Sequence, residues 1–134
     1  MRLWPLEIID QLPRQQLLGQ HRECCALRGK GWGRNHSIVN YVFAHSYALL
    51  ACYHKHILPE MHNRGYKPED KWWESSYRGK FMPPFANPQR VLCLATTSIY
   101  PEHDERYLDE CIENLAAKGV KIDKEKALRR MRVA

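Results

Sequence analysis

The sequence lacks any apolar run near the length of a membrane-spanning helix, and its opening residues lack the apolar stretch of a signal peptide. It also lacks a disulfide framework, because five cysteines cannot all pair and the adjacent Cys24 and Cys25 point in different directions on a helix. These absences argue against a membrane protein and a secreted one. We expect a cytoplasmic protein with reduced, buried thiols and no membrane partner.

Metal-binding spacings are missing as well. No Cys-x-x-Cys or His-Glu-x-x-His motif occurs, and Cys52, His54 and His56 would project to different faces of one helix. We therefore expect no metal site and no cofactor. A cysteine hydrolase that uses Cys25 with a histidine is an alternative, although no local sequence signature supports it.

The charge of the chain favours an anionic partner. Its 134 residues, 44% of them hydrophobic, suit a single domain, 1–134, with residues 120–134 as a basic C-terminal extension. The formal net charge is +6 at pH 7, and phosphate backbones attract basic surfaces without any sequence signal. Charge alone leaves nucleic acid binding undecided, because many basic proteins of this size bind none. We expect a monomer.

Helical signals dominate the first half of the chain. Pro13 suits the first turn of a helix over residues 13–28, which a glycine-rich segment ends. Ser46 would cap a second helix, and Gly65 would close it. The apolar residues 37–43 are too few to form a paired strand, so we interpret them as a buried irregular or short helical segment.

The second half predicts a long loop and two further helices. Residues 66–89 hold four prolines and several large aromatic residues, which favours an ordered loop over a linker. A buried irregular or short helical segment is expected again at 90–95. Asp104 would cap a third helix over residues 105–118, and Asp123 a short basic helix. The five cations of that last helix form either a functional tail or an ordinary solvated face. The pattern as a whole predicts an all-α domain of three main helices.

The first helix carries the most informative pattern. Apolar residues share one face, whereas Glu23 falls on the opposite face with Gly19 one turn before it. A glycine inside a helix costs about 1 kcal/mol relative to alanine, and close approach by a backbone or a ligand is the usual compensation. We expect a partner to lie against this face. A surface ion pair within the helix is the alternative for a lone glutamate.

Two segments combine cations with aromatic residues. Residues 28–36 suit a chain that follows a phosphate backbone while stacking on a base. The candidate DNA contacts in this segment are Arg28, Lys30, Trp32 and Arg34. A mobile connector with Trp32 packed on the core is an equally good interpretation.

The second such segment lies in the long loop. Trp72 and Trp73, with Arg78 and Lys80, would supply a stacking surface for an unpaired or flipped base. Core packing is the alternative for the tryptophans. We expect one of the two adjacent rings to pack inward.

Several of these residues resemble a known family. Leu17, the pair Arg22 and Glu23, and the N-terminal Arg2 are similar to the opening of the pyrimidine-dimer DNA glycosylases, whose phage members are called endonuclease V. The resemblance extends thinly to about residue 118 and is strongest to an uncharacterised bacterial branch. It implies an all-α fold, no cofactor and damaged double-stranded DNA as the partner, in the cytoplasm at the nucleoid.

The resemblance also implies a mechanism for DNA repair. An amine attacks the sugar C1′, and the resulting imine permits cleavage of the strand at the abasic site. The α-amine of Met1 would be this nucleophile, because the bulky Arg2 is expected to block methionine removal, and its ordinary pKa of about 7.7–8.0 leaves neutral amine available. Glu23 would stabilise the cationic intermediate and move protons. Arg2 and Arg22 would contact phosphates, with an ordinary surface arginine as the alternative for each.

Two departures from the family leave the lesion open. Ala26 stands where the family has a further arginine, for which Arg28 would substitute, and a lysine and arginine tail replaces the family's aromatic C-terminal stretch. Pyrimidine dimers follow from the resemblance, while an abasic site or another modified base fits the same chemistry. A non-catalytic nucleic-acid-binding protein with the same fold is the alternative from a different class.

Overall fold

The computed structural model describes residues 2–86 and 99–132, which form helices and no strand. The four α-helices in these ranges are α1 (Arg14–Arg28), α2 (Tyr47–Asn63), α3 (Glu105–Ala117) and α4 (Lys124–Arg132). Three 3-10 helices accompany them, namely η1 (Leu6–Gln11), η2 (Ser37–Ala44) and η3 (Asp70–Trp73). The predicted all-α fold is confirmed. The apolar segment 90–95 lies outside the described residues.

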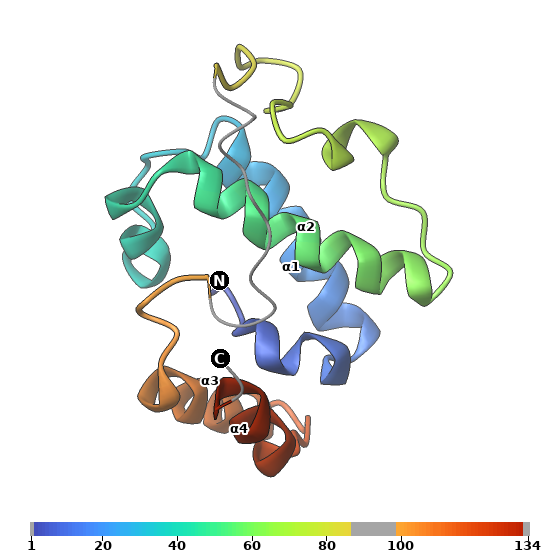
Figure 1. Ribbon diagram of the computed structural model, residues 1–134, viewed down its shortest axis with the longest axis vertical. Coiled ribbons are helices and arrows are strands. Elements are labelled where there is room, and N and C mark those ends of the chain that lie inside the picture. Colours follow the sequence, from blue (N-terminus) through green and yellow to red (C-terminus); the bar gives the residue numbers. More distant parts are fainter. Residues whose placement is uncertain (1, 87–98, 133–134) are drawn as a thin grey trace.

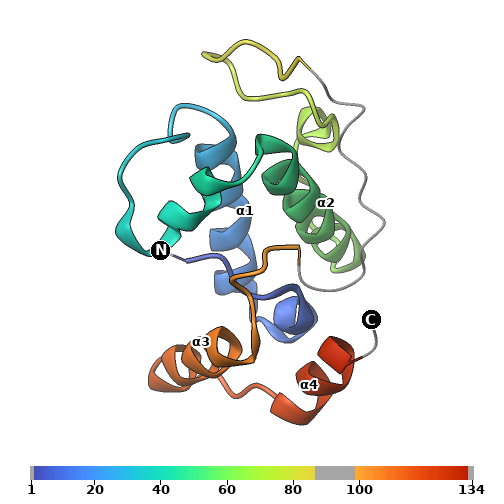
Figure 2. The same cartoon turned by 60° about the vertical axis from the view of Figure 1, so that its left-hand side comes forward.

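The N-terminal segment runs between two layers of helices. Helices α1 and α2 pack against each other in one layer, and α3 and α4 form the other (Figure 1). Figure 2 shows η1 between them, in contact with both α2 and α4. Leu3, Ile8 and Leu12 of this segment are fully buried. The sequence pattern did not predict η1, because six residues are too few to show a helical period.

Side-chain caps begin the helices where the sequence predicted them. The Ser46 hydroxyl accepts a hydrogen bond from a backbone N–H at the start of α2 at 3.1 Å. Asp104 and Asp123 do the same for α3 and α4, at 2.9 and 3.2 Å. Gly65 follows α2 with φ +83°, a backbone conformation that glycine adopts without steric cost. These local signals account for the accuracy of the predicted helix ends.

Helix α4 is docked on the protein. Leu128 is buried, and the Arg130 guanidinium donates two hydrogen bonds of 2.7 Å to the Asp10 carboxylate. Lys124 forms an ion pair with Asp109 at 2.7 Å. Much of the positive charge of this helix is therefore directed at the protein's own carboxylates. Within the described residues, no helix is long and apolar enough to cross a membrane.

Aromatic side chains join the two layers. His103 stacks on Tyr107 with ring centroids 4.8 Å apart, and the Tyr41 hydroxyl is hydrogen-bonded to the His103 ring. His103 is almost completely buried. Burial disfavours the charged imidazolium and lowers the pKa of His103 to about 4.

We expect the free energy of unfolding to fall as the pH is lowered through this cluster's titration range. Unfolded His103 binds its proton near its ordinary pKa of about 6.5, whereas the folded protein resists protonation down to about pH 4. The contribution of neutral His103 to the free energy of unfolding is fully present above about pH 6.5. It is lost as the pH falls from about 6.5 to about 4, because the unfolded state binds the proton first. Urea unfolding at several pH values measures the loss.

The variant His103→Gln isolates this contribution. It should lose less stability than the wild type between the same two pH values, by up to about 3 kcal/mol, which is the free energy of a shift of this size. His62→Gln changes an exposed histidine of α2 and should follow the wild type. Equal pH dependence in all three proteins would contradict the assignment.

Candidate functional site

A cavity of about 340 Å³ lies between the N-terminal arm, α1 and the end of α3. It brings together three residues that the sequence predicted for the site, namely Arg2, Arg22 and Glu23. We call it the Glu23 pocket. Its lining consists of Arg2, Trp4, Gln15, Gln16, Gly19, Gln20, Arg22, Glu23, Ile38, Asn114 and Lys118.

Glu23 is half-buried in this pocket. Its Oε1 atom is inaccessible to solvent and has no hydrogen-bond partner among the described residues. Burial raises the pKa of the Glu23 carboxyl above its ordinary value, because the carboxylate loses hydration. The alternative of an ion pair within the helix is not seen in the described part of the chain. A carboxyl in this state suits proton transfer.

Three cations line the pocket together with Glu23. The Arg2 guanidinium lies over the rings of Trp4 and Tyr107, 6.0 and 5.9 Å from their centroids. The Lys118 ammonium also lies over Trp4, at 5.7 Å. Arg22 is exposed at the pocket wall. The pocket therefore favours an anionic ligand such as a phosphodiester backbone.

Gly19 leaves one wall of the pocket bare. A Cβ atom at this position would have a single neighbour within 4 Å, the Arg22 guanidinium at 3.9 Å. The protein itself does not fill the space beside this glycine. The bare helix face predicted from the sequence is confirmed, and a partner on it stays a prediction.

A strained segment borders the same pocket. Ser37 has φ +28°, a value that is uncommon for a residue with a side chain, and Gly33 has φ +79°. The Nε2 atom of His36 is buried without a hydrogen-bond partner in the described residues. Ile38, which follows, lines the pocket. The sequence marked residues 28–36 as a candidate DNA-contacting segment, but it did not predict the backbone strain at Ser37 or a place for Ile38 in the pocket.

The sequence did not predict a site role for several other pocket residues, among them Trp4, Gln20, Asn114 and Lys118. Gln20 had a usable signal, because it lies one turn before Glu23 on a helix whose period was recognised. Asn114 and Lys118 had none. Their place in one pocket with residues of the first helix depends on how the two layers pack.

Arg28 does not lie at a DNA-binding surface. It is fully buried, and its guanidinium donates to the backbone carbonyl oxygens of Trp72, Glu74 and Tyr77 at 2.9, 2.8 and 2.8 Å. The prediction that Arg28 contacts DNA, or replaces the family arginine missing at Ala26, is wrong. The long loop needs buried hydrogen-bond donors, and this arginine supplies them.

We expect Arg28→Met to lower the free energy of unfolding by roughly 3 kcal/mol or more, because several buried acceptors lose their donor. Urea denaturation measures the difference. Arg34→Met removes the same charge from an exposed position and should change stability by less than about 0.5 kcal/mol. Similar stabilities of the two variants would show that the buried hydrogen bonds contribute little.

Four of the other predicted contact residues gather around a second cavity, of about 310 Å³, at the C-terminal end of α1. Lys30, Trp72, Arg78 and Lys80 all line it. So does Phe81, which is 74% exposed and has the Lys30 ammonium 4.1 Å from its ring centroid. The structure thus joins the two cationic, aromatic segments of the sequence in one place.

The three predicted tryptophans, Trp32, Trp72 and Trp73, differ in how far they are buried. Trp72 is partly buried and Trp73 is 38% exposed, so one of the adjacent rings packs inward as predicted. Trp32 packs edge-on against Phe43, with ring centroids 5.1 Å apart, which is the core-packing alternative. Arg34 is exposed and lines neither cavity described above.

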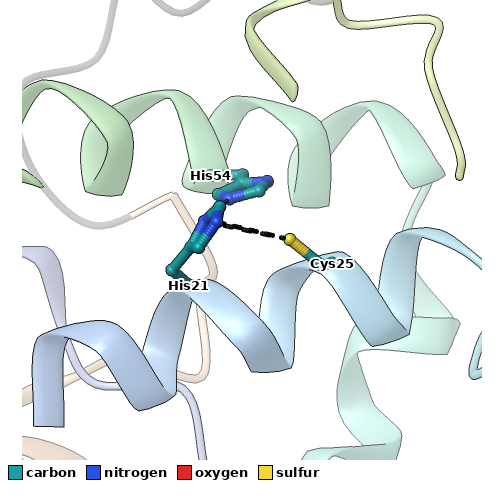
Figure 3. Close-up of side chains that lie close together, drawn as sticks. All are labelled: His21, Cys25 and His54. Atoms are coloured by element: carbon teal, nitrogen blue, oxygen red, sulfur yellow. Dashed lines mark hydrogen bonds between the residues drawn. The ribbon is translucent and has the colours of Figure 1, made fainter. Parts of the chain in front are cut away.

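Three potential metal ligands from α1 and α2 lie close together (Figure 3), and one of them, Cys25, lines the second cavity. The ligand atoms of His21, Cys25 and His54 lie within 4.8 Å of one another. Arg28 donates to Nδ1 of His54 at 2.9 Å, which leaves the His54 proton on Nε2, and this atom donates to Nδ1 of His21 at 2.8 Å. Both facing nitrogens are therefore used in a hydrogen bond between the rings.

The protonation of this cluster also disfavours a metal ion and a cysteine nucleophile. Burial raises the pKa of the Cys25 thiol to about 12, so the thiolate is scarce at neutral pH. Burial and the positive charge of Arg28 lower the pKa of His54. The donor set fits a hydrogen-bonded cluster of neutral groups, and the absence of a metal from the function remains a prediction.

Comparison with known proteins identifies the family of the chain. Residues 1–74 match the family model described as pyrimidine dimer DNA glycosylase, and this stretch holds Arg2, Arg22 and Glu23. No curated protein and no solved structure matches the chain. Asn114 and Lys118, which close the pocket, lie outside the matched stretch. The match covers more than half of the chain, and the protein therefore belongs to the pyrimidine dimer DNA glycosylase family, a family of DNA repair.

Proposed function

We propose that the protein is a DNA glycosylase and abasic-site lyase that uses the α-amine of Met1 as its nucleophile and Glu23 as the assisting carboxyl group. The observation that carries the proposal is the half-buried, unpartnered Glu23 in one pocket with Arg2. Met1 lies outside the described residues. It precedes Arg2 in the chain, and the proposal requires its amine to reach this pocket.

The reaction begins with an attack of the neutral amine on C1′ of the damaged nucleotide. The bond from C1′ to the base breaks, and the base leaves with the electron pair and takes up a proton. Opening of the sugar ring then converts the adduct into an iminium ion between the amine nitrogen and C1′. The protonated Glu23 carboxyl supplies a proton in this step, which its raised pKa favours.

Strand cleavage follows from the iminium ion. Its positive charge acidifies the proton on C2′, and removal of that proton expels the 3′ phosphate by β-elimination. The Glu23 carboxylate is the base within the pocket, and its negative charge stabilises the cation. Hydrolysis of the imine releases the cleaved DNA and regenerates the amine. No cofactor takes part in these steps.

The surrounding cations would bind the DNA backbone. Arg2, Arg22 and Lys118 line the same pocket as Glu23 and suit contacts to phosphates on either side of the lesion. The second cavity, with its cations and the exposed Phe81, suits stacking of an unpaired base from the same duplex. We propose damaged double-stranded DNA as the substrate and a pyrimidine dimer as the lesion.

Borohydride trapping on a duplex with one abasic site tests the mechanism, because hydride reduces the iminium carbon to a stable amine. We expect a covalent adduct, and peptide mapping should locate it on Met1. Glu23→Gln should lower the trapping rate by about 10²-fold or more, the usual contribution of a general acid or base. Glu113→Gln changes an exposed glutamate of α3 and serves as the matched control.

Intact mass must first show that the α-amine is free. With a free amine, failure to form any adduct would contradict the lyase and favour a non-catalytic DNA-binding protein. An adduct on a lysine would assign the nucleophile elsewhere. If Glu23→Gln were trapped at the wild-type rate, Glu23 would have no role in the reaction.

Gly19→Ala gives opposite predictions for stability and binding. Alanine should raise the free energy of unfolding by up to about 1 kcal/mol, because glycine is the poorer helix former. The same methyl group occupies space on the bare pocket wall and should weaken binding to abasic-site DNA several-fold. Urea denaturation and fluorescence anisotropy measure the two effects. Unchanged or tighter binding would show that the DNA does not lie against this face.

A further inference from the structure

The backbone of the N-terminal arm is held by one glutamine side chain of α1. The Gln20 Oε1 atom accepts a hydrogen bond from the Trp4 N–H at 2.6 Å, and its Nε2 atom donates to the Arg2 carbonyl oxygen at 3.1 Å. A backbone N–H only donates and a carbonyl only accepts, so the orientation of the amide is determined. Both polar atoms of the Gln20 amide therefore form hydrogen bonds with the backbone of the arm.

Two tyrosines from the other helices complete this arrangement. The Tyr53 hydroxyl of α2 shares its proton between the Trp4 carbonyl oxygen at 2.5 Å and Gln20 Oε1 at 2.9 Å. Tyr107 of α3 donates to the Leu3 carbonyl oxygen at 2.7 Å. Residues 2–4 are therefore hydrogen-bonded to α1, α2 and α3 at once. Such a set of contacts leaves the arm one conformation.

Gln20 also belongs to the reaction site. It is 2% exposed, yet it lines the Glu23 pocket and precedes Glu23 by three residues on the same helix. Residues at this spacing lie on neighbouring positions of a helix surface. The same turn of α1 thus carries the carboxyl group and the group that holds the arm.

We propose that Gln20 is a positioning residue that fixes the N-terminal arm relative to Glu23 and so determines where the amine of the first residue meets the sugar. This inference rests on the function proposed above. The physical reason is the steep distance dependence of nucleophilic attack, in which a misplacement of about 1 Å costs up to about 10²-fold in rate. Without these hydrogen bonds the arm would adopt several conformations. With them, residues 2–4 have a fixed position relative to Glu23, and this limits where the amine of the preceding residue can react.

A purely structural role for Gln20 makes a different prediction, and the chain offers a matched control. Gln11 likewise forms two hydrogen bonds to a backbone, donating to the Asp123 carbonyl oxygen at 3.3 Å and accepting from its N–H at 2.7 Å. These bonds join η1 to α4, away from the Glu23 pocket. Gln20→Met and Gln11→Met are therefore the same chemical change with the same type of lost contact.

The experiment compares single-turnover trapping rates at saturating protein, well below the unfolding temperature of each variant. We expect Gln20→Met to react 10- to 100-fold more slowly than the wild type, since misplacement acts on the rate of attack. Its affinity for a duplex with a tetrahydrofuran abasic analogue, which cannot form an imine, should change less than threefold. Gln11→Met should react at the wild-type rate.

Two further measurements connect the rate to the arm. Tyr53→Phe removes the hydroxyl that donates to the Trp4 carbonyl oxygen and to Gln20, and it leaves both bonds between Gln20 and the arm. It should slow trapping by a smaller factor than Gln20→Met. Amide hydrogen exchange at Trp4 should be slow in the wild type and Gln11→Met, and fast in Gln20→Met, because the Trp4 N–H loses its acceptor.

The outcomes separate this inference from the proposed function. A wild type that forms no adduct overturns the proposed function and this inference with it. A wild type that forms the adduct, with Gln20→Met reacting equally fast, overturns the inference alone. Equal slowing in Gln11→Met and Gln20→Met would assign the effect to general stability. Slowing confined to Gln20→Met, with faster exchange at Trp4, supports the inference.

Discussion

The hydrogen bonds between Gln20 and the N-terminal arm are the constraint on which the rest of the structure depends. The arm runs between the two helical layers, where its backbone groups are removed from water and must be paired. Gln20 and Tyr53 meet this requirement from one layer, and Tyr107 meets it from the other. The layers are therefore joined through the arm, and the arm leads directly into the Glu23 pocket.

The pocket and its border hold buried polar groups without partners in the described residues. Glu23 Oε1 and His36 Nε2 are both buried without a hydrogen-bond partner in the described residues. Ser37 has a strained backbone conformation, and Gly19 leaves a helix face bare. Unsatisfied polar atoms and strain reduce stability, and such features are common at functional sites.

Arg28 shows how a charged residue changes its role with its surroundings. Its sequence neighbours are glycines and cations, which suggested a phosphate contact at the surface. In the fold it binds the carbonyl oxygens of the loop that follows α2, and this loop then forms the wall of the second cavity. Arg28 therefore supports a candidate DNA-binding surface from within the protein. Lys30 and Lys80 supply the exposed charge.

Local interactions let the sequence by itself determine the helices, because Ser46, Asp104 and Asp123 act on backbone groups within a few residues. The placement of Glu23 opposite the apolar face also followed from the helical period. Only the tertiary structure decided that Arg28 is buried, that His21 meets His54, and that α3 closes the Glu23 pocket. These contacts join residues far apart in the chain, and they depend on layer packing that no short-range pattern encodes.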